Sequence, residues 1–179
     1  DQPEWVVLGG LEQEGDKSQR YEAMDDGSLL ACGYAPTKFT QWFRTTNDFW
    51  AITAFRLELL TDPDLPYGGP GRAFNGTCAL SDFLVEATDL NHPTNKAKAK
   101  WAGATADYNQ PERKLESNYD DKTTNGRTTG PIEFATDGKA ETAWGTNAGP
   151  GRRNQERKAV FASSLPEGFG GNSYPPVGL

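Results

Sequence analysis

The chain has 179 residues, with 18 basic and 25 acidic side chains, so its net charge at pH 7 is −7. This length predicts about one domain, since ~100–200 residues per domain is typical. Mean hydropathy is −0.73, and no run approaches the ~18 apolar residues of a membrane span. The acidic total also argues against nucleic-acid binding, which requires a basic footprint.

Glycine and proline are frequent, at 20 and 12 residues, beside 5 Trp, 6 Tyr and 9 Phe. The glycines and prolines favour a loop-rich β protein, and the large rings favour an ordered core over a disordered chain. Cys32 and Cys78 lack metal-site spacing, and the sequence leaves open either one disulfide or two buried thiols.

Strand patterns separated by turn signals follow one another along the chain. The Asp26-Gly27 pair predicts a hairpin whose return strand covers 28–33. The clearest strand is 51–60, in which alternation predicts that Phe55, Leu57 and Leu59 face the core. Further strands are expected within 40–46, 78–88, 97–108, 132–135, 142–145 and 158–162. This pattern predicts an all-β fold, a sandwich or jelly roll.

We expect a single β-sandwich domain over residues 1–165. The polar residues 109–130 predict a long surface loop. Residues 166–179 are rich in Gly and Pro and predict a tail or a truncated edge, because proline cannot donate to a strand ladder.

The tetrapeptide Gly-Pro-Gly-Arg occurs twice, at 69–72 and 149–152. Proline presets φ at the first central position of a turn and glycine accepts a positive φ at the second, so each copy predicts a tight turn with an arginine at its exit. Two rigid turns that present Arg72 and Arg152 would suit a hydroxyl-rich or anionic ligand. The alternative is that these arginines fix long loops to backbone carbonyls.

Several rings lie near predicted loops or strand ends, and we single out Trp50, Tyr67 and Trp101. An exposed ring of this kind can stack on the apolar face of a sugar. The alternative is that they pack in the core.

Asp137 and Thr142 flank a turn at Gly138 where several carbonyls can converge. Carboxylate, hydroxyl and carbonyl oxygens are the ligands of Ca²⁺, which takes about six to eight of them. The alternative is a turn in which Asp137 accepts hydrogen bonds from its own backbone.

Catalytic motifs are missing from the sequence. His92 is the only histidine, and Ser81 lies in Leu-Ser-Asp rather than in a nucleophile elbow. No zinc-protease, phosphate-loop or dinucleotide motif occurs. We therefore predict no catalytic residues and interpret the many carboxylates as solvated surface groups.

The chain resembles a β-sandwich module of large secreted planctomycete proteins, which often combine a cytochrome c-type domain with two domains of unknown function. The resemblance covers roughly residues 5–165. It rests on segments 52–58, 62–66, 69–76, 80–83, 104–108, 137–144 and 149–154.

The Asp137-Gly138 turn with Thr142-Ala143-Trp144 is also similar to the discoidin or coagulation-factor type C group of galactose-binding-like modules. This resemblance implies a galactose-binding-like jelly roll with glycan-binding loops at one end. It further implies a structural Ca²⁺ held by Asp137 and Thr142, with Asp82 as an additional ligand. A secreted or periplasmic-type location follows from the same resemblances.

Together these features predict a non-catalytic carbohydrate-binding module of an exported protein, with polysaccharide as its partner. The expected ligand-binding residues are Trp50, Tyr67, Arg72, Asn75, Trp101, Arg152, Arg153 and Asn154. One alternative is a structural or docking domain that packs against neighbouring domains of a longer chain. A third possibility is a glycan-active enzyme that uses two facing carboxylates as acid and base.

Overall fold

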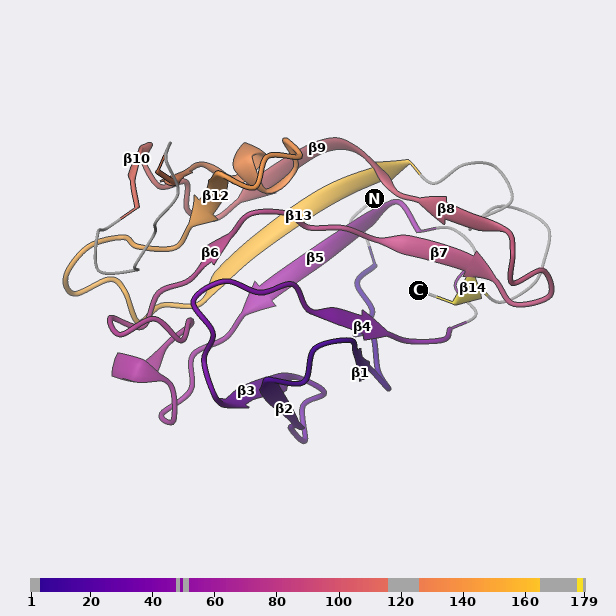
Figure 1. Ribbon diagram of the computed structural model, residues 1–179, viewed down its shortest axis with the longest axis horizontal. Coiled ribbons are helices and arrows are strands. Elements are labelled where there is room, and N and C mark those ends of the chain that lie inside the picture. The colour runs from indigo at the N-terminus through magenta and orange to yellow at the C-terminus, as the bar shows by residue number, and fades with distance from the viewer. Residues whose placement is uncertain (1–3, 48, 50–51, 116–125, 165–176, 179) are drawn as a thin grey trace.

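A computed structural model describes residues 4–47, 49, 52–115, 126–164 and 177–178. Strands dominate this part of the chain, as expected (Figure 1). The strands are β1 (Glu12–Glu14), β2 (Gln19–Ala23), β3 (Leu29–Gly33), β4 (Trp42–Arg44), β5 (Ala54–Leu59), β6 (Ala79–Leu80), β7 (Glu86–Asp89), β8 (Lys96–Lys98), β9 (Lys100–Ala106), β10 (Arg113–Lys114), β11 (Thr128–Gly130), β12 (Thr142–Gly145), β13 (Arg157–Ser164) and β14 (Val177–Gly178). Two short 3₁₀ helices, η1 (Pro66–Gly68) and η3 (Ile132–Ala135), interrupt them.

Two sheets form the centre of the molecule. One has the strand order β5-β13-β9 and is antiparallel throughout. The other has the order β10-β11-β12-β6, in which the β11–β12 pair is parallel. A third sheet, β14-β7-β8, and two ribbons, β2-β3 and β1-β4, complete the pairing. This arrangement is nearly all-β and consistent with a β-sandwich.

The core lies where β13, β12 and η3 meet. Trp144 and Phe161 are fully buried there, and the Phe161 ring stacks on Phe83 with centroids 4.3 Å apart. Phe55 is buried, and Leu57 and Leu59 pack against the same cluster. The predicted inward face of strand 51–60 is therefore confirmed, although β5 itself is shorter.

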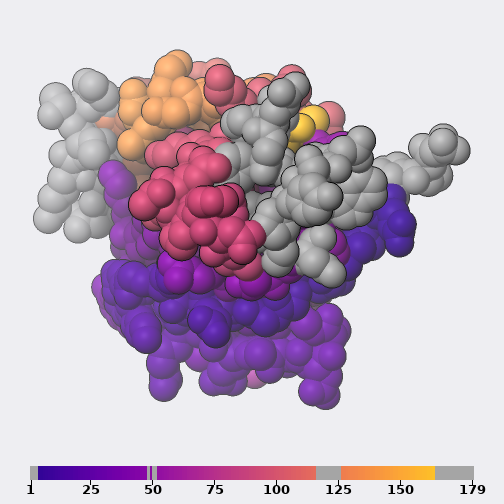
Figure 2. Space-filling view, turned by 90° about the vertical axis from the view of Figure 1, so that its right-hand side faces the viewer, coloured from indigo at the N-terminus to yellow at the C-terminus, as the bar shows by residue number. Residues whose placement is uncertain are grey.

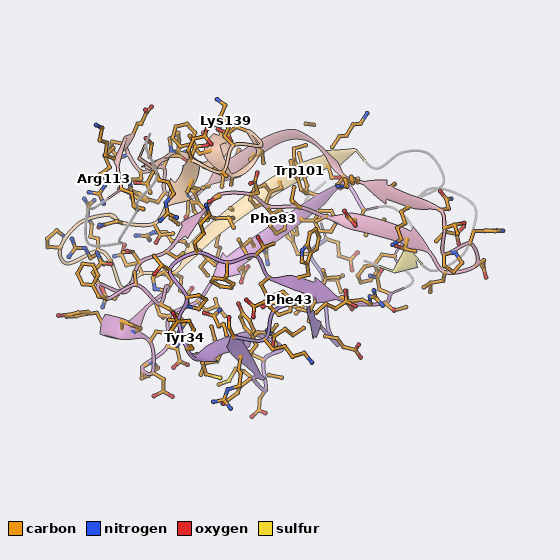
Figure 3. The ribbon with its side chains drawn as sticks, viewed as in Figure 1. Tyr34, Phe43, Phe83, Trp101, Arg113 and Lys139 are labelled. Carbon is orange, nitrogen blue, oxygen red and sulfur yellow. The ribbon has the colours of Figure 1, made fainter. Side chains whose placement is uncertain are left out.

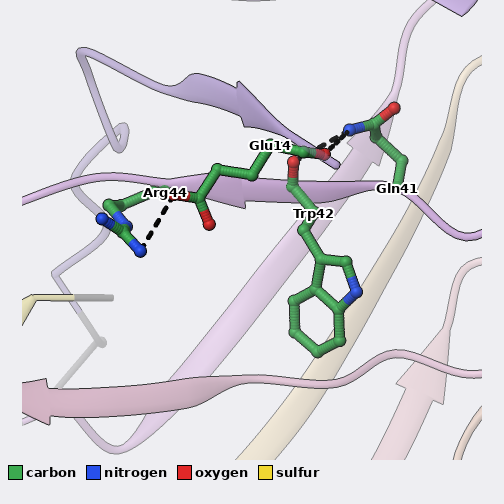
Figure 4. A network of polar contacts seen from close by, with 4 residues as sticks. All are labelled: Glu14, Gln41, Trp42 and Arg44. Atoms are coloured by element: carbon green, nitrogen blue, oxygen red, sulfur yellow. Dashed lines mark hydrogen bonds and ion pairs between the residues drawn. The ribbon is translucent and has the colours of Figure 1, made fainter. Parts of the chain in front are cut away.

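The N-terminal ribbons form a separate layer along one side, seen in indigo and purple in Figure 2. The predicted hairpin at Gly27 is confirmed, because β2 pairs with β3 and Gly27 has a φ of +84°. In the β1-β4 ribbon, Gln41 Nε2 donates to the backbone carbonyls of Glu14 and Trp42, each at 2.9 Å (Figure 4). An ion pair of 2.9 Å between Arg44 and Glu14 links the same strands.

Two sequence predictions differ from the structure. Residues 132–135 form the 3₁₀ helix η3 instead of a strand, because the carbonyl of Pro131 accepts from the Phe134 amide at 3.2 Å and closes a turn. The polar segment 109–130 is not one continuous surface loop, because it contains β10 and β11. Two polar side chains of this segment are buried and bonded to each other, since Gln110 Nε2 donates to Thr129 Oγ1 at 2.6 Å.

The expected Gly/Pro-rich tail, 166–179, lies mostly outside the described residues. Its described part, β14, pairs with β7. Across the described part of the chain, no helix has the length and apolar character that crossing a membrane requires.

Candidate functional site

The second Gly-Pro-Gly-Arg copy is the tight turn that the sequence predicts. The Arg152 amide donates to the Gly149 carbonyl at 3.2 Å. Gly151, at the second central position, has a φ of +77°, which is a type II turn. The Arg152 side chain is exposed at the exit of the turn.

Buried groups beneath this turn hold it in place. The Oδ1 atom of buried Asn147 accepts from the Gly149 amide and from Arg153 Nε, each at 3.0 Å. Arg157, also buried, donates to the Arg152 carbonyl at 2.9 Å. The Arg157 guanidinium also lies over the Tyr108 ring, 5.1 Å from its centroid. The second turn is therefore fixed from two sides.

The first copy, at 69–72, adopts a different conformation. The Gly69-Pro70 bond is cis, and Gly71 is not among the residues with positive φ. Gly71 is required for another reason, because a Cβ there would overlap the Thr77 backbone carbonyl. The loop closes on itself through the Gly71 amide, which donates to the Gly76 carbonyl at 2.9 Å. Predicted ligand residue Asn75 is buried in this loop and accepts from Thr77 Oγ1 at 2.6 Å.

Arg72 at the exit of the first copy turns toward the β2-β3 hairpin. Its guanidinium donates to Gln19 Oε1 and to the backbone carbonyls of Cys32, Gly33 and Tyr34, at 2.5–3.2 Å. This is the alternative that the sequence left open, in which the arginine fixes a loop to backbone carbonyls. All these acceptors are neutral, and among the described residues Arg72 has no carboxylate partner.

Tyr67 is the most exposed of the predicted rings. Its side chain is 81% exposed, on the short η1 helix just before the first copy. The next residue, Gly68, lies against Asn154, two residues after the second copy, since a Cβ on it would be 4.0 Å from the Asn154 Cβ. The structure thus brings the chain at Tyr67 and Gly68 close to Asn154, although the two segments are far apart in sequence. Both Arg152 and Asn154 are exposed.

Of the other two predicted rings, Trp101 does not join this surface. Trp50 lies outside the described residues. Trp101 packs against the core cluster and donates from Nε1 to the Phe83 carbonyl at 3.0 Å. Because its ring contacts Phe55 and Phe161 as well, Trp101 belongs to the core side of β9.

Sequence reasoning missed the exposed Tyr34 ring at this end of the molecule. Tyr34 is 69% exposed, and it lies in the left-hand half of Figure 3, as Arg113 does. Its backbone carbonyl is one of the Arg72 acceptors, so its position is fixed relative to the first copy. The signal was the Gly33-Tyr34-Ala35-Pro36 segment, in which a ring directly follows the end of a strand.

The Asp137 turn is closed by protein groups. Asp137 accepts from the Lys139 amide at 2.9 Å and from Thr142 Oγ1 at 2.7 Å. Partial burial, followed by the charge of Asp137, raises the pKa of the Asp82 carboxyl above its ordinary value. No cluster of three or more His, Cys, Asp or Glu side chains suited to a metal occurs in the ranges that the structure describes.

The histidine and the two cysteines lie apart from the Asp137 turn or have protein surroundings that set their reactivity, as far as the described residues show. His92 Nδ1 lies 2.9 Å from Asp89 Oδ2 at the end of β7, and this hydrogen bond lowers the pKa of Asp89. Cys32 and Cys78 are both free thiols. Burial raises the pKa of Cys78 to about 11, so its thiolate is scarce at neutral pH.

A cleft of about 290 Å³ lies beside the two loops. Strands β10, β11, β12 and β6 contribute one part of its lining, and residues 35–37 and 39 contribute another. Arg72 and Asn147, which organise the two copies, are also among its lining residues.

Comparison with known proteins identifies no relative. No protein-family model, curated protein or solved structure matches the chain. Function must therefore be inferred from the geometry at this end of the molecule, and the resemblances expected from the sequence stay predictions.

Proposed function

We propose that the chain is a non-catalytic module that binds polysaccharide through the loops carrying Tyr67, Arg152 and Asn154. The observation that carries this proposal is the open Tyr67 ring, whose chain neighbour Gly68 lies against Asn154 just after the second Gly-Pro-Gly-Arg copy. A phenol ring can cover the apolar face of a sugar. A guanidinium and an amide next to it can donate hydrogen bonds to the sugar hydroxyls.

Support for a rigid site comes from the groups below these loops. Asn147 and Arg157 hold the second turn, and Arg72 ties the first to the hairpin. A preformed surface lowers the ordering cost of binding. Affinity should still be modest, because solvent competes for every hydrogen bond at an exposed site.

The wider setting belongs to the same proposal. We take the sandwich to be a galactose-binding-like jelly roll from an exported protein, of the kind found in large secreted planctomycete chains. The nearly all-β structure, with its binding loops at one end, is compatible with that fold class.

The proposal includes a structural Ca²⁺ ion at the Asp137 turn. Asp137, Thr142 and Asp82 would hold it, and its charge would relieve the repulsion between the two carboxylates. The fit is incomplete, since Asp137 already accepts hydrogen bonds from Lys139 and Thr142, and Ca²⁺ requires about six to eight oxygens. The ion would brace the turn without contacting sugar.

The test combines sedimentation with insoluble polysaccharides and a glycan array, each with Ca²⁺ and with EDTA. Tyr67→Ala and Asn154→Ala should lose retention, because one removes the ring and the other a neighbouring amide. Trp42→Ala is the matched control, since this exposed ring lies in the β1-β4 ribbon. If no glycan is retained in either format, or if all three variants bind as the unmodified protein does, the proposal is wrong.

One observation favours the second candidate, a docking domain. Val6 and Val7 are exposed, Val7 by 70%, and Val7 lies against the Gly27 turn next to exposed Met24. Exposed aliphatic groups of this kind suit a protein neighbour. Co-elution of the chain with its adjacent domains, abolished by Val7→Asp, would support docking.

A further inference from the structure

We propose that the cleft beside the loops binds the anionic group of an acidic polysaccharide, a sulfate ester or a uronate carboxylate. The choice of a polysaccharide as carrier rests on the proposed function. The choice of an anion rests on the cleft itself, whose volume is about 290 Å³. This volume is near the lower limit of ligand pockets, ~300 Å³, and suits one charged group with the ring that bears it.

The charge lining the cleft is opposite to that of the whole chain. Among the lining residues that the structure describes, four are basic and one is a carboxylate, although the net charge of the chain is −7. The basic residues are Arg72, Arg113, Lys114 and Arg127, and the acidic one is Glu141. A concave surface of one sign focuses the electrostatic potential and concentrates ligands of the opposite sign.

Arg72 supplies a cation that has no carboxylate partner among the described residues. Its side chain is half-buried, and its hydrogen bonds all go to a neutral amide oxygen and to backbone carbonyls. Removing a charge from water is costly unless an opposite charge compensates it. An anion in the cleft would provide that compensation without displacing the hydrogen bonds that hold the hairpin.

Lys114 provides a second cation, on a flexible and exposed side chain. It lies on β10 opposite Thr128 of β11, and its side chain is exposed at the cleft. Arg113 and Arg127 also line the cleft, and each of them engages other groups as well. Hydroxyl groups of Thr37 and Ser81 line the same space and can donate to anionic oxygens.

A polysaccharide fits this pattern better than a nucleic acid does. Nucleic-acid binding depends on a continuous basic surface that tracks many phosphates. Here positive charge gathers in one small cleft of an acidic protein. Widely spaced charges on a sugar chain match a single cleft of this kind, with neighbouring sugars free to reach the exposed loops.

The experiment measures binding to dextran sulfate, to polygalacturonate and to neutral dextran by isothermal titration calorimetry at several salt concentrations. Two variants test the cleft from different segments of its lining, Lys114→Glu on β10 and Thr37→Glu in residues 35–37. Each should weaken binding of an acidic polymer by about tenfold and reduce the salt dependence, because each places a negative charge near the bound anion. Lys96→Glu is the matched control, an exposed strand lysine on β8 that does not line the cleft.

The two acidic polymers distinguish the source of the charge. Preference for dextran sulfate assigns the cleft to sulfate esters, and preference for polygalacturonate assigns it to uronates. Equal binding of the cleft variants and the unmodified protein would overturn the inference. Equally tight binding of single-stranded DNA would overturn it too, since it would indicate a general polyanion surface.

Failure of the proposed function gives a different result. If Tyr67→Ala leaves binding unchanged while Lys114→Glu weakens it, the exposed loops are not the binding surface and the cleft stands. If Tyr67→Ala weakens binding of every polymer and neither cleft variant does, the exposed loops are the binding surface and the cleft inference is wrong.

Discussion

Replacement of the two repeat arginines by alanine should have very different effects on stability. Arg72 and Arg152 end identical tetrapeptides. The Arg72 guanidinium joins the first loop to the β2-β3 hairpin through four hydrogen bonds. The Arg152 side chain is exposed, and only its backbone takes part in the second turn.

The expected magnitude follows from the bonds that are lost. A hydrogen bond with one charged partner contributes ~1.5–3 kcal/mol, and bonds from one side chain are far from additive. Freeing an arginine regains up to about 2 kcal/mol of rotamer entropy. Arg72→Ala should therefore lower the free energy of unfolding by roughly 2–4 kcal/mol. Arg152→Ala should change it by less than about 0.5 kcal/mol.

Urea unfolding followed by tryptophan fluorescence measures both. With a denaturant slope of about 2 kcal/mol per molar, the midpoint for Arg72→Ala should fall by roughly 1–2 M. Arg72→Lys should be intermediate, because lysine keeps the charge but cannot form the planar fork. If Arg72→Ala and Arg152→Ala have equal midpoints, the hydrogen bonds of Arg72 do not hold the hairpin and the structural assignment is refuted.

Three other changes test the loops, the thiols and the paired carboxylates. Gly71→Ala should lower the melting temperature far more than Gly151→Ala, because the first creates a backbone overlap and the second costs only about 1 kcal/mol at a positive φ. Equal melting temperatures would contradict this. Alkylation of the denatured protein, measured by intact mass, should label both Cys32 and Cys78. In the native protein Cys78 should react slowly at pH 8, because its pKa is about 11. Rapid labelling of both thiols in the native protein would contradict the burial of Cys78. The pKa of Asp82 in the folded protein lies above its ordinary value of 3.8. The folded state therefore binds this proton more tightly than the unfolded state does. As the pH falls from neutral toward 3.8, the unmodified protein should gain stability relative to Asp82→Asn. A constant difference between the two in urea melts across that range would rule out a raised pKa of Asp82 in the folded protein.

Strands whose local sequence pattern agrees with their burial in the fold could be predicted from the sequence. In β5 the alternation of Phe55 and Leu57 with Arg56 and Glu58 coincides with burial on one face. The Gly27 hairpin depends on residues that are neighbours in the chain. In both cases the physical cause lies within a few residues of its effect.

Elements that depend on distant contacts were missed. Strands β10 and β11 are polar in sequence, and their place in the interior depends on Gln110, which pairs with Thr129 and accepts from the Asn147 amide. The same limit applies to Trp101, whose ring finds Phe55, Phe83 and Phe161 from three other segments. A single strand with small alternating residues gives no sign of those partners.

The repeated tetrapeptide shows the limit most clearly for the site. Its sequence predicts one turn type for both copies, yet only 149–152 adopts it. At 69–72 the residues that follow return the chain onto Gly71, and the arginine is drawn to the hairpin. Context therefore turns one copy into a structural anchor and leaves the arginine of the other copy exposed.

This division matters for binding because it sets the entropic cost. Each long side chain that is immobilised on binding costs ~0.5–1.5 kcal/mol. Arg72, Arg153 and Arg157 are already held by hydrogen bonds, so a sugar on the exposed loops would order chiefly Tyr67 and Arg152. The cost of binding is then about 1–3 kcal/mol from these two side chains. If Arg72, Arg153 and Arg157 were as mobile as Tyr67 and Arg152, binding would have to order all five side chains. Weak stacking and solvent-exposed hydrogen bonds would not offset that entropic cost.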